Sequence, residues 1–170
     1  TYDYTTYGFS NLTKVTFPKR LKEIGDYAFY NSKINSLDFD ARGGLTTIGN
    51  SAFYNCTKIT NITFPKALST ISEKAFYGCT GIQELTIPAS VESIGKNAFR
   101  GLTGLTSLTF IKGNKDLTIG ETAFFGETSL ESLTVPGNIK TMGRYAFAGC
   151  TSITNLTLEN KSNNDSSISR

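Results

Sequence analysis

The sequence contains no histidine. Histidine is the commonest general base and the commonest transition-metal ligand, so Ser-His-Asp and Cys-His catalysis are excluded within this chain. Charge is also sparse, because 17 Lys and Arg against 14 Asp and Glu leave a net charge of +3 on 170 residues. This small and scattered excess argues against nucleic-acid binding.

Long hydrophobic runs are missing as well. No stretch of about 18 apolar residues occurs, so we expect no membrane span in this chain. The polar start, Thr1–Thr6, lacks the apolar core of a signal peptide, and position 1 is not Met. We therefore expect a mature or excised fragment of an exported protein.

A repeated Ala-Phe pair organises the chain. It occurs with Phe29, Phe53, Phe76, Phe99, Phe124 and Phe147, at successive spacings of 24, 23, 23, 25 and 23 residues. Five residues before each Phe stands an apolar residue, such as Ile71 before Phe76. Self-similarity at a period of 20 to 50 residues is typical of a solenoid. We expect the repeated Phe side chains to form one buried stack.

Two further blocks recur in each repeat. The first, apolar-x-x-apolar-x-apolar, alternates at its end as a half-buried strand does and is followed by Pro in four copies. The second, such as Val91 to Ile94, is followed by Gly in five of six copies, and Ser72 stands in the sixth. A recurrent Gly predicts either a positive φ or a close approach of two backbones. We expect the turn at Ser72 to match the other turns with allowed dihedral angles.

Together these blocks resemble the BspA-type leucine-rich repeats of bacterial surface antigens. The pattern L-x-x-I-x-I-P-x-x-V-x-x-I-G-x-x-A-F-x-x-C is matched nearly position for position by residues 83–99, and the resemblance covers about residues 12–158. It implies a right-handed α/β-class solenoid with a parallel sheet on the concave face and short helical or 3₁₀ turns on the convex side. It also implies export to the cell surface, roles in adhesion, no enzymatic activity and no cofactor.

The predicted domain is a single solenoid over residues 1–158 with about six to seven rungs of 23–25 residues. Residues 1–11 are interpreted as a short terminal repeat, and residues 159–170 as a polar tail or cap. The three cysteines, Cys56, Cys79 and Cys150, each stand three residues after a Phe. No C-x-x-C motif is present, so small buried side chains are favoured over the alternatives of redox or metal chemistry. The matching positions elsewhere carry Ser32, Leu102 and Glu127.

The candidate binding face consists of the strand side chains that the core does not need. These are Lys14, Thr16, Ser36, Asp38, Asn61, Thr63, Glu84, Thr86, Ser107, Thr109, Ser132, Thr134, Asn155 and Thr157. They are short and polar and lack the aromatic and Arg anchors of binding hot spots. Two longer repeats add loops, Asp40–Gly44 and Ile111–Lys115, whose Arg42, Lys112 and Lys115 make a mildly basic second candidate edge.

The sequence favours a monomeric, extracellular or surface-bound interaction module that binds a protein or glycan of a host or bacterial surface. The alternative is a structural spacer in a larger multidomain surface protein. An ice-binding surface, suggested by Thr in six of seven equivalent strand positions, is disfavoured because the neighbouring exposed positions are irregular.

Overall fold

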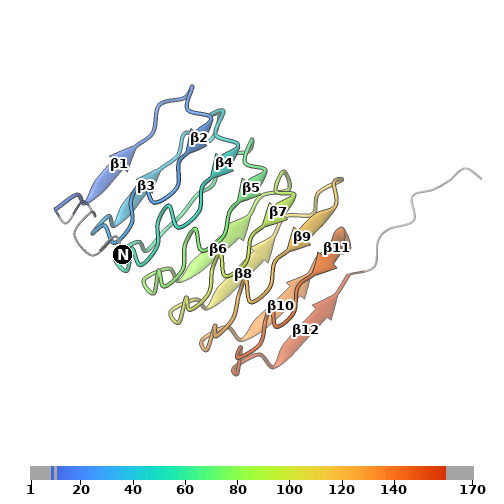
Figure 1. Cartoon of the computed structure of the whole chain (residues 1–170). Helices are drawn as coiled ribbons and strands as arrows, with labels where there is room; N and C mark the ends of the chain where they lie inside the picture. The colour runs from blue at the N-terminus through green and yellow to red at the C-terminus, as the bar shows by residue number, and fades with distance from the viewer. Residues whose placement is uncertain (1–8, 10, 160–170) are drawn as a thin grey trace, which may run out of the picture.

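The structure is a computed structural model that describes residue 9 and residues 11–159. The chain winds as a parallel β-solenoid of about six turns, in which each turn adds short strands to two opposite surfaces (Figure 1). Short strands suffice here because every rung pairs with its neighbours, so hydrogen bonding and burial accumulate along the stack. The predicted solenoid is therefore confirmed. Its division into residues 1–158 and a tail stays a prediction, and residues 1–8, 10 and 160–170 lie outside the described part.

The predicted strands form what we call the front face. It comprises β1 (Lys14–Thr16), β3 (Ser36–Asp38), β6 (Glu84–Ile87), β8 (Ser107–Phe110), β10 (Ser132–Val135) and β12 (Asn155–Leu158). These strands pair in parallel as β1–β3, β6–β8 and β10–β12, and Asn61 bridges Ser36 to Glu84. Each strand alternates as its sequence predicts: β6 exposes Glu84 and Thr86 and buries Leu85 and Ile87.

A second parallel sheet, the back sheet, was not predicted. It is built from β2 (Glu23–Ile24), β4 (Thr47–Ile48), β5 (Thr70–Ile71), β7 (Ser93–Ile94), β9 (Leu117–Ile119) and β11 (Ile139–Met142). These six strands lie in the order β11–β9–β7–β5–β4–β2, so the sheet runs through successive rungs. The block of two apolar residues before the recurrent Gly thus makes a strand, and the core lies between this sheet and the front face.

The turn around each Ala-Phe pair is not helical, which corrects the expectation of helical or 3₁₀ turns. Among the described residues no helix is present, and six-residue turns occupy these positions. The residue before each Ala has a left-handed φ of 52–58°, as at Ser51 and Lys74, and such a residue interrupts a right-handed helix. Moreover, the N–H of Phe53 donates to the carbonyl of Ala75 on the next rung at 2.8 Å, while the N–H of Ala52 donates locally to Gly49. Alternating local and rung-to-rung bonds replace the helical pattern.

The recurrent Gly is required by close approach and not by a positive φ. A Cβ at Gly95 would lie 2.6 Å from the backbone N of Glu73 and 2.7 Å from the carbonyl C of Ser72 on the preceding rung. None of the five Gly residues of this set has a positive φ. Ser72 does not have one either, as expected. The Gly residues with positive φ belong to a different position, two residues after the Phe, such as Gly78.

The predicted Phe stack is confirmed. Phe29, Phe53, Phe76, Phe99, Phe124 and Phe147 stack with centroid separations of 5.2, 5.1, 5.4, 5.1 and 5.1 Å and nearly parallel planes. The four inner rings are completely buried. Rung-to-rung backbone hydrogen bonds place the Phe residues directly above one another, so their rings have no other direction in which to pack.

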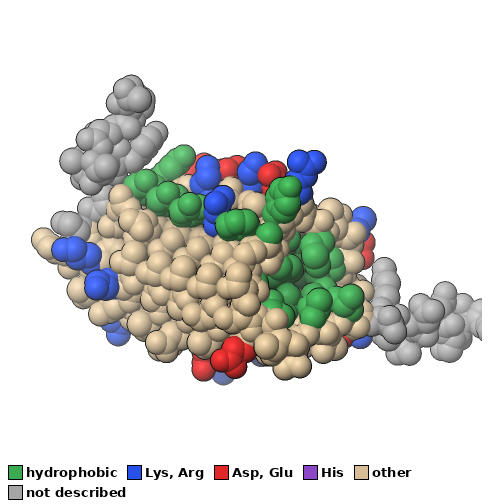
Figure 2. Space-filling view, turned by 90° about the horizontal axis from the view of Figure 1, so that it is seen from below, with side chains coloured by type: hydrophobic (Ala, Val, Ile, Leu, Met, Phe, Trp, Pro, Cys, Tyr) green, Lys and Arg blue, Asp and Glu red, His purple; other side chains and the backbone are tan. Residues whose placement is uncertain are grey.

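The rung that carries β12 leaves apolar side chains uncovered by other described residues. Met142, Tyr145, Leu156 and Leu158 are all exposed there. Figure 2 shows hydrophobic side chains gathered at this end, whereas most of the visible surface is formed by uncharged polar groups and backbone. Because the core is continuous along the stack, its last layer faces outward wherever no further rung covers it.

Candidate binding surfaces

The structure brings the predicted binding residues together on the front face. All fourteen are exposed, and parallel pairing aligns them in columns. Thr16 pairs with Asp38, Thr86 with Thr109, and Thr134 with Thr157. Side chains at equivalent positions therefore project from one continuous surface. Whether this surface binds a ligand stays a prediction.

A hollow of about 590 Å³ lies where the first longer loop meets the front face. Thr16, Asp38 and Thr63 line one side, and Asp40 and Ala41 of the loop line the other. Lys19 forms an ion pair of 3.5 Å with Asp40 at its wall. The Asp40 side chain is fixed further by the backbone N–H of Arg42, which donates at 2.8 Å and lowers the pKa of Asp40. The hollow thus has a polar rim and an apolar floor formed by Phe17 and Phe39.

A second hollow, of about 270 Å³, adjoins the first through Thr63, which lines both. Its other walls include Thr86, Pro88 and Ile111, the last from the second longer loop. Ile111 is 52% exposed and offers an apolar contact that the residue types of the face did not predict. The two loops and the Thr column between them therefore form one groove, which we call the loop groove.

The predicted basic edge is partly neutralised. Lys115 forms a close ion pair with Glu92, and Lys140 pairs with Asp116 at 3.4 Å. Lys19 is engaged by Asp40 as described above. Exposed ion pairs contribute little to stability, but they reduce the net positive charge that the edge presents. Arg42 and Lys112 belong to the same two loops.

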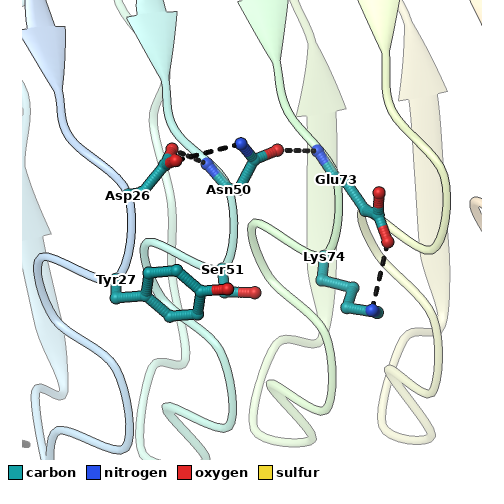
Figure 3. Close-up of a pocket in the computed structure, with 6 residues that line it drawn as sticks. All are labelled: Asp26, Tyr27, Asn50, Ser51, Glu73 and Lys74. Carbon is teal, nitrogen blue, oxygen red and sulfur yellow. Dashed lines mark hydrogen bonds and ion pairs between the residues drawn. The ribbon is translucent and has the colours of Figure 1, made fainter. Parts of the chain in front are cut away.

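A polar ladder crosses three rungs at the turns that follow the back-sheet strands (Figure 3). Asp26 accepts hydrogen bonds from the backbone N and from Nδ2 of Asn50, at 2.6 and 3.1 Å. The Asn50 side-chain oxygen accepts from the backbone N of Glu73 at 3.2 Å, and Glu73 pairs with Lys74 at 3.1 Å. These residues line a hollow of about 260 Å³. Their acceptors are used by the chain itself, so the ladder fastens rungs together.

Sequence analysis missed an aromatic column beside the buried Phe stack. The residues that follow the Phe in each repeat lie in a row, and Tyr54 is stacked between Tyr30 and Tyr77 at centroid separations of 4.9 and 4.8 Å. Arg100 continues the row, with its guanidinium 6.0 Å from the Tyr77 ring and 4.6 Å from the Phe125 ring. Comparing the position after each Phe across the repeats would have revealed this column.

The cysteine positions form a buried ladder, as expected. Cys56 and Cys79 are fully buried, Cys150 is partly buried, and all three are free thiols. Each thiol donates to the carbonyl of the Phe one rung back, for example Cys79 to Phe53 at 3.0 Å. Burial raises the pKa of Cys56 to about 12. Within the described ranges, no cluster of His, Cys, Asp or Glu is arranged to hold a metal ion.

Glu127 occupies the cysteine position of its rung and is completely buried. Neither carboxyl oxygen has a hydrogen-bond partner. Burial raises its pKa from the usual 4.5 to about 8, although the nearby backbone amides of Leu102 and Gly101 act in the opposite direction. The carboxyl group is therefore mostly protonated at neutral pH. In the part of the chain that is described, no helix is long and apolar enough to cross a membrane.

Three solved structures share this architecture. A leucine-rich cell surface protein of Faecalibacterium prausnitzii A2-165 is 26% identical with a TM-score of 0.73, and the match covers 89% of this chain and 40% of that protein. A leucine-rich repeat protein of T. pallidum is 25% identical with a TM-score of 0.72, over 89% of this chain and 71% of that protein. A leucine-rich repeat protein of Bacteroides ovatus, at 23% identity, TM-score 0.58, and coverage of 92% and 51%, supports the fold alone.

None of the curated proteins compared with the chain matches it significantly. The family model for the BspA type leucine rich repeat region matches in six copies, over residues 2–106 and 93–168. These matches span nearly the whole chain and include every Ala-Phe turn described above. The chain therefore belongs to the BspA-type leucine-rich repeat family.

Proposed function

We propose that this chain is a non-enzymatic interaction module of a bacterial surface protein, and that it binds a protein or glycan ligand in the loop groove. The observation that carries the proposal is the hollow of about 590 Å³ between the Thr column and the loop that begins at Asp40. Ligand sites are concave, with an apolar lining and a few well-placed polar groups. This hollow combines Phe17 and Phe39 with Thr16, Asp38 and Thr63.

The groove supplies the chemistry that such a ligand needs. Thr hydroxyls donate and accept hydrogen bonds, and the Asp38 carboxylate accepts them. The exposed Ile111 adds an apolar contact at the far wall. No nucleophile with an adjacent base is present among these residues, which favours recognition over catalysis. Extracellular placement is proposed from the F. prausnitzii relative, which is a cell surface protein.

Filling the groove tests the proposal. Thr63→Arg combined with Thr86→Arg should weaken binding to the extracellular-matrix proteins and glycans that the unaltered chain binds, by roughly tenfold or more, because both side chains line the hollows. The matched control is Thr134→Arg combined with Thr157→Arg, which makes the same change in equivalent columns outside the groove. Equal loss in both variants, with the fold intact by circular dichroism, would contradict the loop groove as the site.

A spacer role is the second candidate. The chain spans only 40% of the F. prausnitzii protein, so in a longer protein the solenoid can hold another domain away from the surface. A solenoid suits this role because it is stiff along its stacking direction. If the unaltered chain binds none of the ligands in the screen, the spacer role is favoured.

A further inference from the structure

The aromatic column lies apart from the front face and offers a different chemistry. Tyr54, Tyr77, Arg100 and Phe125 are each half-buried and follow one another on successive rungs. We propose that this column is a second binding surface, which takes an anionic polysaccharide along the stacking direction. The proposal is independent of the loop groove.

Stacking decides which part of each ring a ligand can reach. Tyr54 has neighbouring rings on both faces, at 4.9 and 4.8 Å, and its plane lies within 11° of theirs. Only ring edges and phenol groups remain for contact. Ring edges carry the positive part of the aromatic quadrupole, and the negative faces are covered. Burial raises the pKa of Tyr54, so its hydroxyl stays a donor at neutral pH. The column thus presents groups that favour anionic oxygen.

Arg100 supplies the fixed charge. Its guanidinium lies over Phe125 and Tyr77, and Nη1 donates to the Asn97 side chain at 3.3 Å. Among the described residues Arg100 makes no ion pair, since every recorded pair involves other residues. A guanidinium has five donors in a fork that matches a carboxylate. Most of these donors are therefore available to an anion, and the two rings hold the fork in place.

Several smaller groups beside the column add to this chemistry. Lys74 lies near Tyr54, and the ammonium group lowers the pKa of that phenol although burial dominates. Lys33 and Lys58, exposed on the turns that follow Asn31 and Asn55, also make no ion pair within the described part of the chain. The acidic Glu73 is already engaged by Lys74. The local balance is positive, and small polar side chains accompany it.

The backbone beside the column argues against a peptide ligand. The carbonyls of Tyr54, Tyr77, Arg100 and Phe125 each accept a hydrogen bond from the preceding rung, for example Gly78 N to Arg100 O at 2.9 Å. An extended peptide therefore finds no free backbone groups with which to add a strand. Its side chains on one face would also repeat about every 6.8 Å, whereas the stacked Tyr rings repeat at 4.8–4.9 Å. A hydroxyl- and carboxylate-rich polymer needs only the side-chain donors.

The test uses polygalacturonic acid as the probe, with neutral dextran as the comparison ligand and binding measured by calorimetry at low salt. Arg100→Glu should weaken binding by at least tenfold, and Tyr77→Phe, which keeps the stack but removes a hydroxyl, by about threefold. Arg100→Lys keeps the charge without the planar fork and should fall between Arg100→Glu and the unaltered protein. Arg20→Glu, an exposed Arg outside the column, makes the same change in net charge and should alter binding less than twofold.

Each other result would overturn the proposal. Equal loss in Arg20→Glu and Arg100→Glu would indicate attraction by net charge alone. Equal binding of dextran would show that anionic groups are not read, and tighter binding of poly-glutamate would assign the column to acidic peptides. Absence of binding by the unaltered chain would also refute it. Because the Thr63→Arg and Thr86→Arg variant does not touch the column, failure of the loop groove and failure of this surface are distinguishable. Thermal melting of every variant confirms that the fold survives.

Discussion

The rings of Phe76 and Phe99, 23 residues apart in the chain, lie 5.4 Å apart with planes that differ by 5°. Both side chains are fully buried. The relation repeats along the molecule because each turn of backbone is hydrogen-bonded to the next, as in Phe76 N to Ala98 O at 2.7 Å. A defect in one ring therefore affects the packing of both neighbouring rungs, and stability is expected to depend strongly on this stack.

Truncating a central ring should be costly. Phe76→Ala is expected to lower the free energy of unfolding by about 3–5 kcal/mol, since it removes a fully buried aromatic side chain and leaves a cavity. Phe9→Ala is the control, because that ring is 54% exposed and should cost less than about 1 kcal/mol. Denaturant melts measure both values. A loss below about 1 kcal/mol for Phe76→Ala would mean that the stack does not stabilise the solenoid.

Adding one methyl group at the recurrent Gly should have opposite consequences in different rungs. Gly95→Ala places a Cβ 2.6 Å from the Glu73 backbone N, so the rungs must separate, and we expect a loss of about 1–3 kcal/mol. Gly25→Ala meets nothing within 4 Å and should be neutral or stabilising by a few tenths of a kcal/mol. Thermal or denaturant unfolding distinguishes them. Equal effects in the two variants would contradict close approach as the reason for Gly.

The folding stability should depend on pH through Glu127. Its pKa is about 8 when folded and near 4.5 when unfolded. The stabilising effect of this raised pKa is therefore complete below about pH 4.5 and is lost as the pH rises to about 8, because the folded state binds the extra proton. The change is on the order of 4 kcal/mol. Cys150, the other titratable group that faces Glu127, has a raised pKa and stays protonated throughout this range.

The matched variant for this prediction is Glu127→Gln, which keeps the shape and removes the titration. Unfolding free energies of both proteins are measured from pH 5 to pH 8.5. The difference between them should grow in favour of Glu127→Gln as the pH rises. Parallel curves would show that the Glu127 carboxyl does not titrate in the buried position. Glu127→Cys, which restores the residue found in three other rungs, should stabilise the protein at pH 8.

The thiols should be unreactive in the folded protein. Burial raises the pKa of Cys56 to about 12 and that of Cys79 even further, so almost no thiolate is present at pH 7. Thiol titration of the native protein should leave these two unmodified, while the partly buried Cys150 reacts slowly. Unfolding should release three reactive thiols. Bound zinc or a disulfide between Cys56 and Cys79 would refute this interpretation.

The sequence by itself determined the solenoid, its rung length, the Phe stack, the cysteine ladder and the exposed strand positions. All of these follow from a period, because residues at equivalent positions of identical turns must lie above one another. The alternation in Glu84–Ile87 was enough to separate the exposed from the buried side chains.

Only the tertiary structure decided the rest. The Ala-Phe segment has the length and composition of a helical turn, but its N–H groups bond across rungs, so hydrogen bonding between neighbours prevailed over local helix formation. The loop groove and the Tyr–Arg column depend on contacts between rungs: Thr16 and Asp40 line one hollow, and Arg100 lies between Tyr77 and Phe125. A repeat read alone gives the direction of each side chain along the rung, whereas stacking determines which neighbours it meets.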